Sequence, residues 1–161
     1  MSCDAVAFSA LLWLASTSPA APPHLSFAAA TAEAATPPSV AQEALFVDIV
    51  HRAGQLKAQA EVYENGPLDG ALDHLAGFDA FRSQVAELAT LDMQGHTLLA
   101  QRGYTDDLKC ILKGISQDLP VKMQALESAG DAKARHDALA DMFYLLRDNV
   151  EVITAPPQPA A

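Results

Sequence analysis

The chain has 161 residues, and half of them are apolar, so it is long enough to fold as one ordinary domain with a buried core. Twenty Asp and Glu residues stand against ten Lys and Arg residues, which gives a formal net charge of −10. This charge repels phosphate backbones and anionic lipid headgroups. The composition therefore argues against general binding to nucleic acids or to membrane surfaces.

An almost uncharged, alanine-rich leader precedes the charged body of the chain, because the first Lys or Arg is Arg52. Residues 5–15 (AVAFSALLWLA) form an apolar run that is shorter than the ~20 residues needed to cross a membrane as a helix. The run suits the apolar region of a secretory signal peptide. Ala28 and Ala30 offer a small-residue cleavage site before Thr31, and Glu33-Ala34-Ala35 offers a later one. We predict a signal-peptide-like leader over 1–30, a linker over 31–39, and an exported protein, either periplasmic or extracellular.

One feature of the leader departs from the signal-peptide pattern. No basic residue precedes the apolar run, and Asp4 is acidic. The alternative interpretation is a disordered, alanine-rich N-terminal tail. We expect no stable membrane span after cleavage of the leader.

Helix signals recur along the body, and strand signals are weak. Ser39 and Gln42 have capping-box spacing and predict the start of a first helix, which the Asn65-Gly66-Pro67 turn ends. The segment 67–75 could add a short helix. A second long helix is expected from Asp79 to Arg102.

Two further helices are expected after Gly103. Thr105 is a good N-cap for the third, which Pro120 should kink or break near residues 116–120 because proline removes a backbone donor and clashes with the preceding turn. Asp131 should cap the fourth.

Each of these segments carries an apolar stripe at helical spacing. The stripes comprise Leu45, Ile49, Ala53, Leu56, Ala60 and Tyr63; Phe78, Phe81, Val85, Leu88, Gly95 and Leu99; Leu108, Ile111, Leu112, Ile115, Leu119, Met123 and Leu126; and Leu139, Met142, Phe143, Leu146, Val150 and Ile153. Short connections make neighbouring helices antiparallel. The predicted fold is therefore all-α: an antiparallel up-down-up-down four-helix bundle over residues 40–154, with a disordered or cleaved leader and a Pro-rich tail over 155–161.

Catalytic constellations are absent from the sequence, which favours a non-enzymatic protein, and no cofactor is predicted. Glu-x-x-His and Cys-x-x-Cys-His do not occur. His96 and His136 flank their stripes and are the best metal ligands that the sequence offers, although surface histidines are the commoner explanation. Paired with a methionine, either could serve a haem. Cys110, beside Lys109 and Lys113, is a candidate reactive thiol, or a possible link in a disulfide-bonded dimer.

The function favoured by the sequence is that of an exported helical-bundle protein that binds another protein as an accessory or scaffold. A kink near Pro120 would open a groove and expose Ile115, Leu119 and Val121 as the protein-binding surface. The alternative is a haem- or metal-binding bundle that uses His and Met side chains. The partner or ligand, the pathway and the oligomeric state are left open by the sequence.

Overall fold

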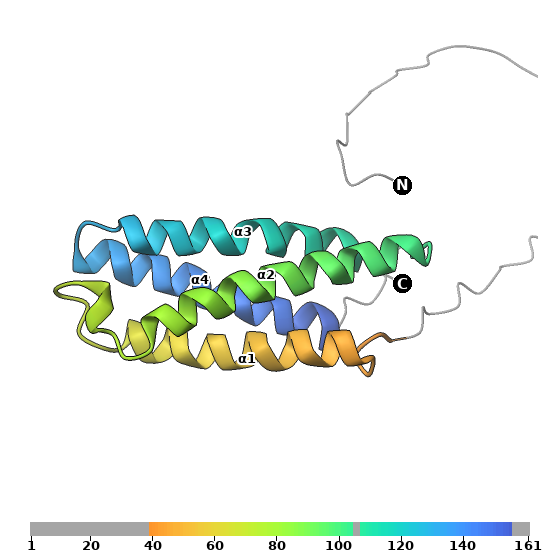
Figure 1. Ribbon diagram of the computed structural model, residues 1–161, viewed down its shortest axis with the longest axis horizontal. Helices are drawn as coiled ribbons and strands as arrows, with labels where there is room; N and C mark the ends of the chain where they lie inside the picture. Colours follow the sequence, from red (N-terminus) through yellow and green to blue (C-terminus); the bar gives the residue numbers. More distant parts are fainter. Residues whose placement is uncertain (1–38, 105–106, 156–161) are drawn as a thin grey trace, which may run out of the picture. The chain divides into compact units, whose positions relative to one another are not determined.

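A computed structural model describes residues 39–104 and 107–155 of the chain. These residues form four long α-helices, α1 (Ala44–Glu64), α2 (Phe78–Gln101), α3 (Leu108–Ser128) and α4 (Ala132–Thr154), with one 3-10 turn, η1 (Leu72–His74), between α1 and α2 (Figure 1). No strand occurs in the described part of the chain. None of these helices combines the length and the hydropathy needed to cross a membrane.

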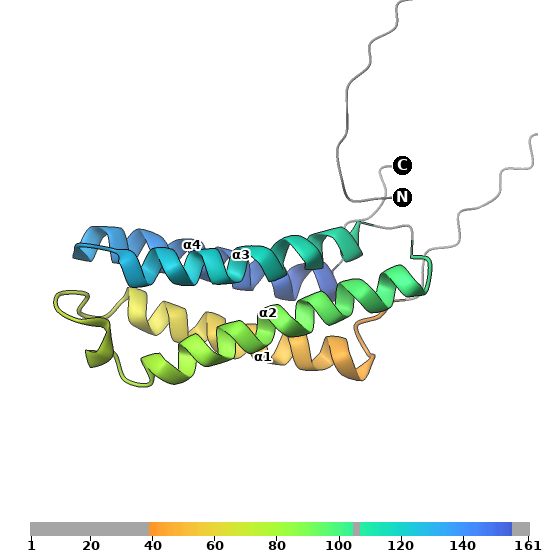
Figure 2. The same cartoon turned by 45° about the horizontal axis from the view of Figure 1, so that its top comes forward.

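The helices pack as an antiparallel bundle. The most extensive contacts join α1 to α4 and α2 to α3, and fewer join α3 to α4 and α1 to α2. Figure 2 shows the four helices running along one common direction. The antiparallel direction of α1 and α2 is clear at both ends, since Arg102 after α2 pairs with Glu43 before α1, and Tyr63 in α1 contacts Phe78 in α2. The predicted four-helix bundle is therefore confirmed.

The core is built from the apolar stripes of all four helices. Of the residues expected to face inward, most are buried, and Leu45, Ile111, Phe143 and Val150 are partly buried at its margin. Helices of this length are held mainly by such tertiary packing, because helix propensity alone is marginal in water. The buried stripes thus fix which face of each helix turns inward and leave the opposite faces open.

The start of α1 differs from the prediction. Residues 40–43 form a turn in which the Glu43 N–H donates to the Val40 carbonyl at 2.9 Å, and the helix begins only at Ala44. Ser39 Oγ accepts from the Ala41 N–H at 3.3 Å rather than capping a helix. The capping-box assignment was therefore wrong. The burial of Val40 and the ion pair of Glu43 with Arg102 outweigh the capping-box sequence.

Pro120 does not break α3, which is continuous from Leu108 to Ser128. The proline is exposed on the outer face of the helix, where the carbonyl freed by its missing N–H can be solvated. The short helix expected over 67–75 is reduced to the 3-10 turn η1, flanked by Gly70 and Gly77 in left-handed conformations (φ 99° and 78°). Thr105, the leader and most of the Pro-rich tail lie outside the described residues.

Asp131 caps α4 as predicted, accepting the Ala134 N–H at 2.8 Å through Oδ1. The connector before α2 is held from two sides. The Tyr63 hydroxyl donates to the Ala76 carbonyl at 2.8 Å, and Arg135 Nη1 on α4 donates to the Leu68 carbonyl at 2.6 Å. These bonds tie the longest described loop to the helices on either side of it.

Gly95 marks the closest approach of helices inside the bundle. A Cβ at this position would lie 3.1 Å from Leu112 Cδ1 on α3 and 3.3 Å from Phe46 Cε1 on α1. Gly54, in contrast, has no other atom within 4 Å of the place where its Cβ would stand. Gly95 therefore allows α2 to pack closely against its neighbours, whereas Gly54 only weakens α1.

We expect Gly54→Ala to raise the free energy of unfolding by about 0.5–1 kcal/mol, because alanine is the better helix former. Gly95→Ala should fall short of that gain by about 1 kcal/mol or more, since Leu112 and Phe46 must shift to admit the methyl group. Urea denaturation of the two variants measures the difference. Equal gains would contradict the close packing at Gly95.

Candidate functional site

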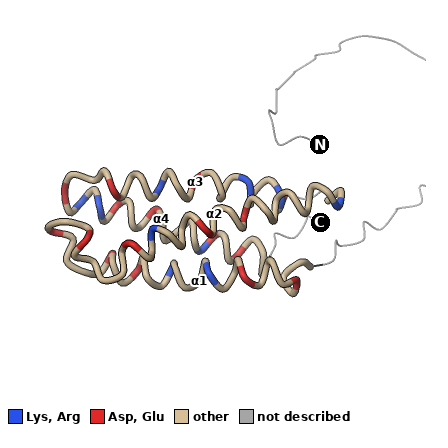
Figure 3. Tube along the Cα trace, viewed as in Figure 1, with Lys and Arg blue, Asp and Glu red and all other residues tan. Residues whose placement is uncertain are grey.

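A shallow groove of about 730 Å³ runs along the outer face of α2 and reaches Leu45 on α1 and Ser116, Gln117 and Pro120 on α3. We call it the α2 groove. None of the described residues that line it is charged, although 19% of the chain is charged. Figure 3 shows acidic and basic residues along all four helices, so an uncharged surface of this size is a distinct feature of the bundle.

The α2 groove follows from the outward stripe of α2. Ala86, Thr90, Met93, Thr97 and Gln101 recur every three or four residues and so fall on one side of the helix, opposite the buried stripe. All five are exposed, and Met93 is the large apolar side chain among them, at 36% exposure. The same periodicity that buries one side of α2 therefore presents a neutral surface on the other.

The residues predicted to bind a partner are placed differently. Ile115 and Leu119 are 5% and 0% exposed and belong to the core, so the prediction that a kink exposes them was wrong. Val121 is 58% exposed but does not line the α2 groove. The α2 groove reaches Pro120, but it is not the groove that a kink was expected to open, because its lining comes mainly from α2.

His96 and His136 are far apart. A Cβ on Gly95, next to His96, would contact Ile49 of α1, whereas His136 Nε2 lies 3.4 Å from Glu64 Oε1. Ile49 and Glu64 are fifteen residues apart on α1, which corresponds to about 22 Å at 1.5 Å per residue. One metal ion cannot bridge the two histidines within a single bundle.

The groups around His96 also argue against a metal or haem site. His96 Nδ1 lies 2.6 Å from the Lys109 carbonyl on α3, which orients the ring between the helices. Met123 and Met142 are buried in the core, and Met93 is on the surface. Within the described residues, no group of three or more His, Cys, Asp or Glu side chains could hold a metal ion. The described residues therefore do not bring His96 and His136 together in one metal or haem site.

Cys110 lies partly exposed on α3 and is not a free thiol. The described residues contain no free cysteine. A nucleophile or an intermolecular disulfide requires an available thiol, and Cys110 does not offer one in the full chain.

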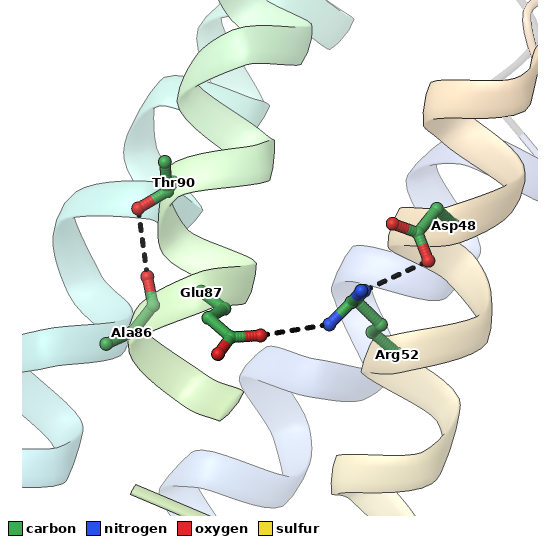
Figure 4. Close-up of polar contacts among 5 residues, drawn as sticks. All are labelled: Asp48, Arg52, Ala86, Glu87 and Thr90. Atoms are coloured by element: carbon green, nitrogen blue, oxygen red, sulfur yellow. Dashed lines mark hydrogen bonds and ion pairs between the residues drawn. The ribbon is translucent and has the colours of Figure 1, made fainter. Parts of the chain in front are cut away.

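A second, polar groove of about 500 Å³ separates α1 from α2. Arg52 of α1 spans it, with Nε 3.0 Å from Asp48 Oδ1 and Nη1 3.1 Å from Glu87 Oε2 on α2 (Figure 4). The hydrogen bond and the charge of Asp48 raise the pKa of Arg52 above its ordinary value. The guanidinium is exposed to solvent, so this bridge contributes little to stability and serves mainly to orient the two sparsely packed helices.

One polar pair lies inside the core. Asp92 of α2 and Asn149 of α4 are both 0% exposed, and Asn149 Nδ2 donates to Asp92 Oδ2 at 2.8 Å. Helices α2 and α4 are not among the extensively packed neighbours, so this bond crosses the middle of the bundle. Burial raises the pKa of Asp92 to about 7, and the hydrogen bond from Asn149 only partly opposes that rise.

The sequence contains a signal for this pair that the apolar patterns passed over. Asp92 stands between Leu88 and Gly95, and Asn149 between Leu146 and Ile153, at the spacing of the buried stripes. A polar residue on an otherwise apolar stripe either has a buried hydrogen-bond partner or does not face the core. Here each of the two polar residues is the hydrogen-bond partner of the other.

Comparison with known proteins gives no relative: no family model, no curated protein and no solved structure matches this chain.

We expect Asn149→Ala to destabilise the bundle by about 1–3 kcal/mol, because it leaves the buried Asp92 carboxyl without its donor. Thr90→Ala is the matched polar-to-alanine control. Its hydroxyl bonds only the Ala86 carbonyl on the exposed face of the same helix, at 3.1 Å (Figure 4), so its effect should stay within about 0.5 kcal/mol. Thermal or urea denaturation measures both, and equal effects would show that the buried pair carries no special weight.

Proposed function

We propose that this protein is an exported, non-enzymatic accessory or scaffold protein that binds a partner protein through the α2 groove. The observation that carries the proposal is the uncharged lining of that groove on a chain with a net charge of −10. Large exposed surfaces without charge are typical of sites where proteins meet. No known relative supplies a function, so the proposal rests on the surface alone.

The occupant that fits best is an amphipathic helix of the partner. The outward stripe of α2 extends from Ala86 to Gln101, which spans about 22 Å, or four turns of a docked helix. Met93 and Leu98 offer apolar contacts, and Thr97 and Gln101 offer hydrogen bonds at the rim. A methionine suits such a surface because its side chain adapts to the shape of its partner.

The charge of the bundle adds a preference to the proposal. The chain carries a net charge of −10, so a partner helix with basic residues beside its apolar face would be attracted on approach. The groove itself would accept only the apolar face, because a charged side chain there would lose water without gaining a partner.

Export is supported by the leader. The apolar run over residues 5–15 and the small residues at Ala28 and Ala30 have the pattern of a secretory signal, although a basic start is lacking. The part of the chain that the structure describes begins after this leader, at residue 39, and folds as a compact unit. Removal of the leader would therefore leave the bundle whole.

We expect the mature protein from its native host to begin close to Thr31, after Ala28 and Ala30 have directed cleavage. N-terminal sequencing combined with intact mass measurement tests this directly. A mature chain that still carries residues 5–15 would contradict export through a cleaved signal and would favour the alternative of an alanine-rich tail.

We expect a photo-crosslinker placed at Met93 to capture a partner protein in the native host, and Met93→Glu to weaken binding of the identified, purified partner at least tenfold, since it buries a charge in the neutral groove. Val62→Glu is the matched control, because Val62 is 69% exposed on α1 outside the groove. Titration calorimetry with the purified partner measures both affinities. Equal losses, or an unchanged affinity for Met93→Glu, would overturn the proposal.

A further inference from the structure

The core pair of Asp92 and Asn149 contains two oxygen atoms whose bonding capacity is unused. Asn149 Nδ2 donates to Asp92 Oδ2, but Asp92 Oδ1 and Asn149 Oδ1, both fully buried, have no hydrogen-bond partner among the described residues. Both oxygens are acceptors when the carboxyl is ionised, so two acceptors share a buried site in which Asn149 Nδ2 is the donor group. An ionised Asp92 therefore leaves the pair half satisfied.

The neighbouring helices do not neutralise Asp92. It takes part in none of the ion pairs formed by the described residues. Within about one turn of its level, the ionisable side chains of the four helices are all at least partly exposed: Asp48, His51 and Arg52 on α1, His96 on α2, Lys113 and Asp118 on α3, and Arg147, Asp148 and Glu151 on α4. A carboxylate without a cation is the most costly form in which such a group can be buried.

We propose that Asp92 is a proton-binding site in the centre of the bundle, and that the folded protein carries this side chain as the neutral acid paired with Asn149. In that form the proton resides on Asp92 Oδ1 and is donated to Asn149 Oδ1, while Asn149 Nδ2 donates to Asp92 Oδ2. The two bonds close a ring that satisfies both oxygens that are otherwise unpaired. Loss of the proton removes one bond and leaves a buried charge, so the bundle loosens as Asp92 ionises.

The expected direction of the pH effect follows from the proton balance. The pKa of Asp92 is raised from its ordinary value of 3.8 to about 7 in the folded protein, chiefly by burial. Between these values the folded state holds one proton more than the unfolded state. The stabilisation by the neutral acid is therefore complete below pH 3.8, declines about tenfold in the folding equilibrium constant per pH unit, and is lost above about pH 7.

The test compares the full chain with its Asp92→Asn variant. An asparagine at this position can form the same two-bond ring with Asn149 but cannot ionise, so it fixes the pair in its neutral form. From about pH 5 to about pH 6.5, the folding equilibrium constant of the wild type should fall about tenfold per pH unit relative to Asp92→Asn. Asp118→Asn is the control, because it makes the same change in net charge at an exposed position on α3.

A second measurement does not depend on the folding of any variant. The carboxyl carbon of Asp92 in the wild-type chain, followed by NMR, should titrate at least two pH units above 3.8, the ordinary value for an aspartate. Titration near the ordinary value would overturn the proposal. The proposal would also be overturned if the ratio of the folding constants of wild type and Asp92→Asn did not change over this pH range. The same holds if the ratio of wild type to Asp118→Asn changed with pH in the same way.

Discussion

The mutual burial of four apolar stripes is the constraint on which the rest of this structure depends. Helices of 21 to 24 residues are marginal in water by themselves, and each has one side that must be shielded. Short connections make sequential helices antiparallel, and one shared core shields all four stripes together. Once the core is formed, the outward faces are free to differ, and this freedom is what allows α2 to present a neutral surface.

The buried pair of Asp92 and Asn149 qualifies that simple picture. It places one polar layer in a core that is otherwise almost wholly apolar, and it connects two helices that are not close neighbours. A single polar contact of this kind is matched only when α2 and α4 are in their correct axial positions, because any slip would leave both groups unsatisfied. The pair thus helps to specify a single arrangement of the helices.

The proposed functions of the two sites are independent of each other. The α2 groove concerns side chains that point outward from α2, such as Met93, whereas the proton site concerns Asp92, which points into the core. Binding and pH response can therefore be tested separately, and failure of one leaves the other standing. The two residues are adjacent in sequence because consecutive positions of a helix lie on different faces.

The sequence allowed the helices and their buried faces to be predicted, because both follow from local spacing. The stripe from Phe81 to Leu99 is one example, and the cap of α4 at Asp131 is another. The errors arose where tertiary contacts overrode local cues. Glu43 pairs with Arg102 rather than extending α1 toward Ser39, and Pro120 lies on the exposed side of α3, where a missing N–H is tolerated.

The sites were harder to predict than the helices, because they depend on which faces meet. Ile115 and Leu119 could be placed at a groove only on the assumption of a broken helix, and a continuous α3 turns both into the core. The separation of His96 from His136 follows from the antiparallel order of the helices, which places the two residues at different levels along the bundle. Asp92 and Asn149 were missed because the pattern was sought among apolar residues alone.

Amide hydrogen exchange of the full chain is the most direct test of the central claim that four stripes close one cooperative core. The account predicts that the slowest amides of α1, α2, α3 and α4 lie on the buried stripes and share one opening free energy, equal to that of global unfolding. Rapid exchange throughout any one of these helices, while the other three remain protected, would contradict it.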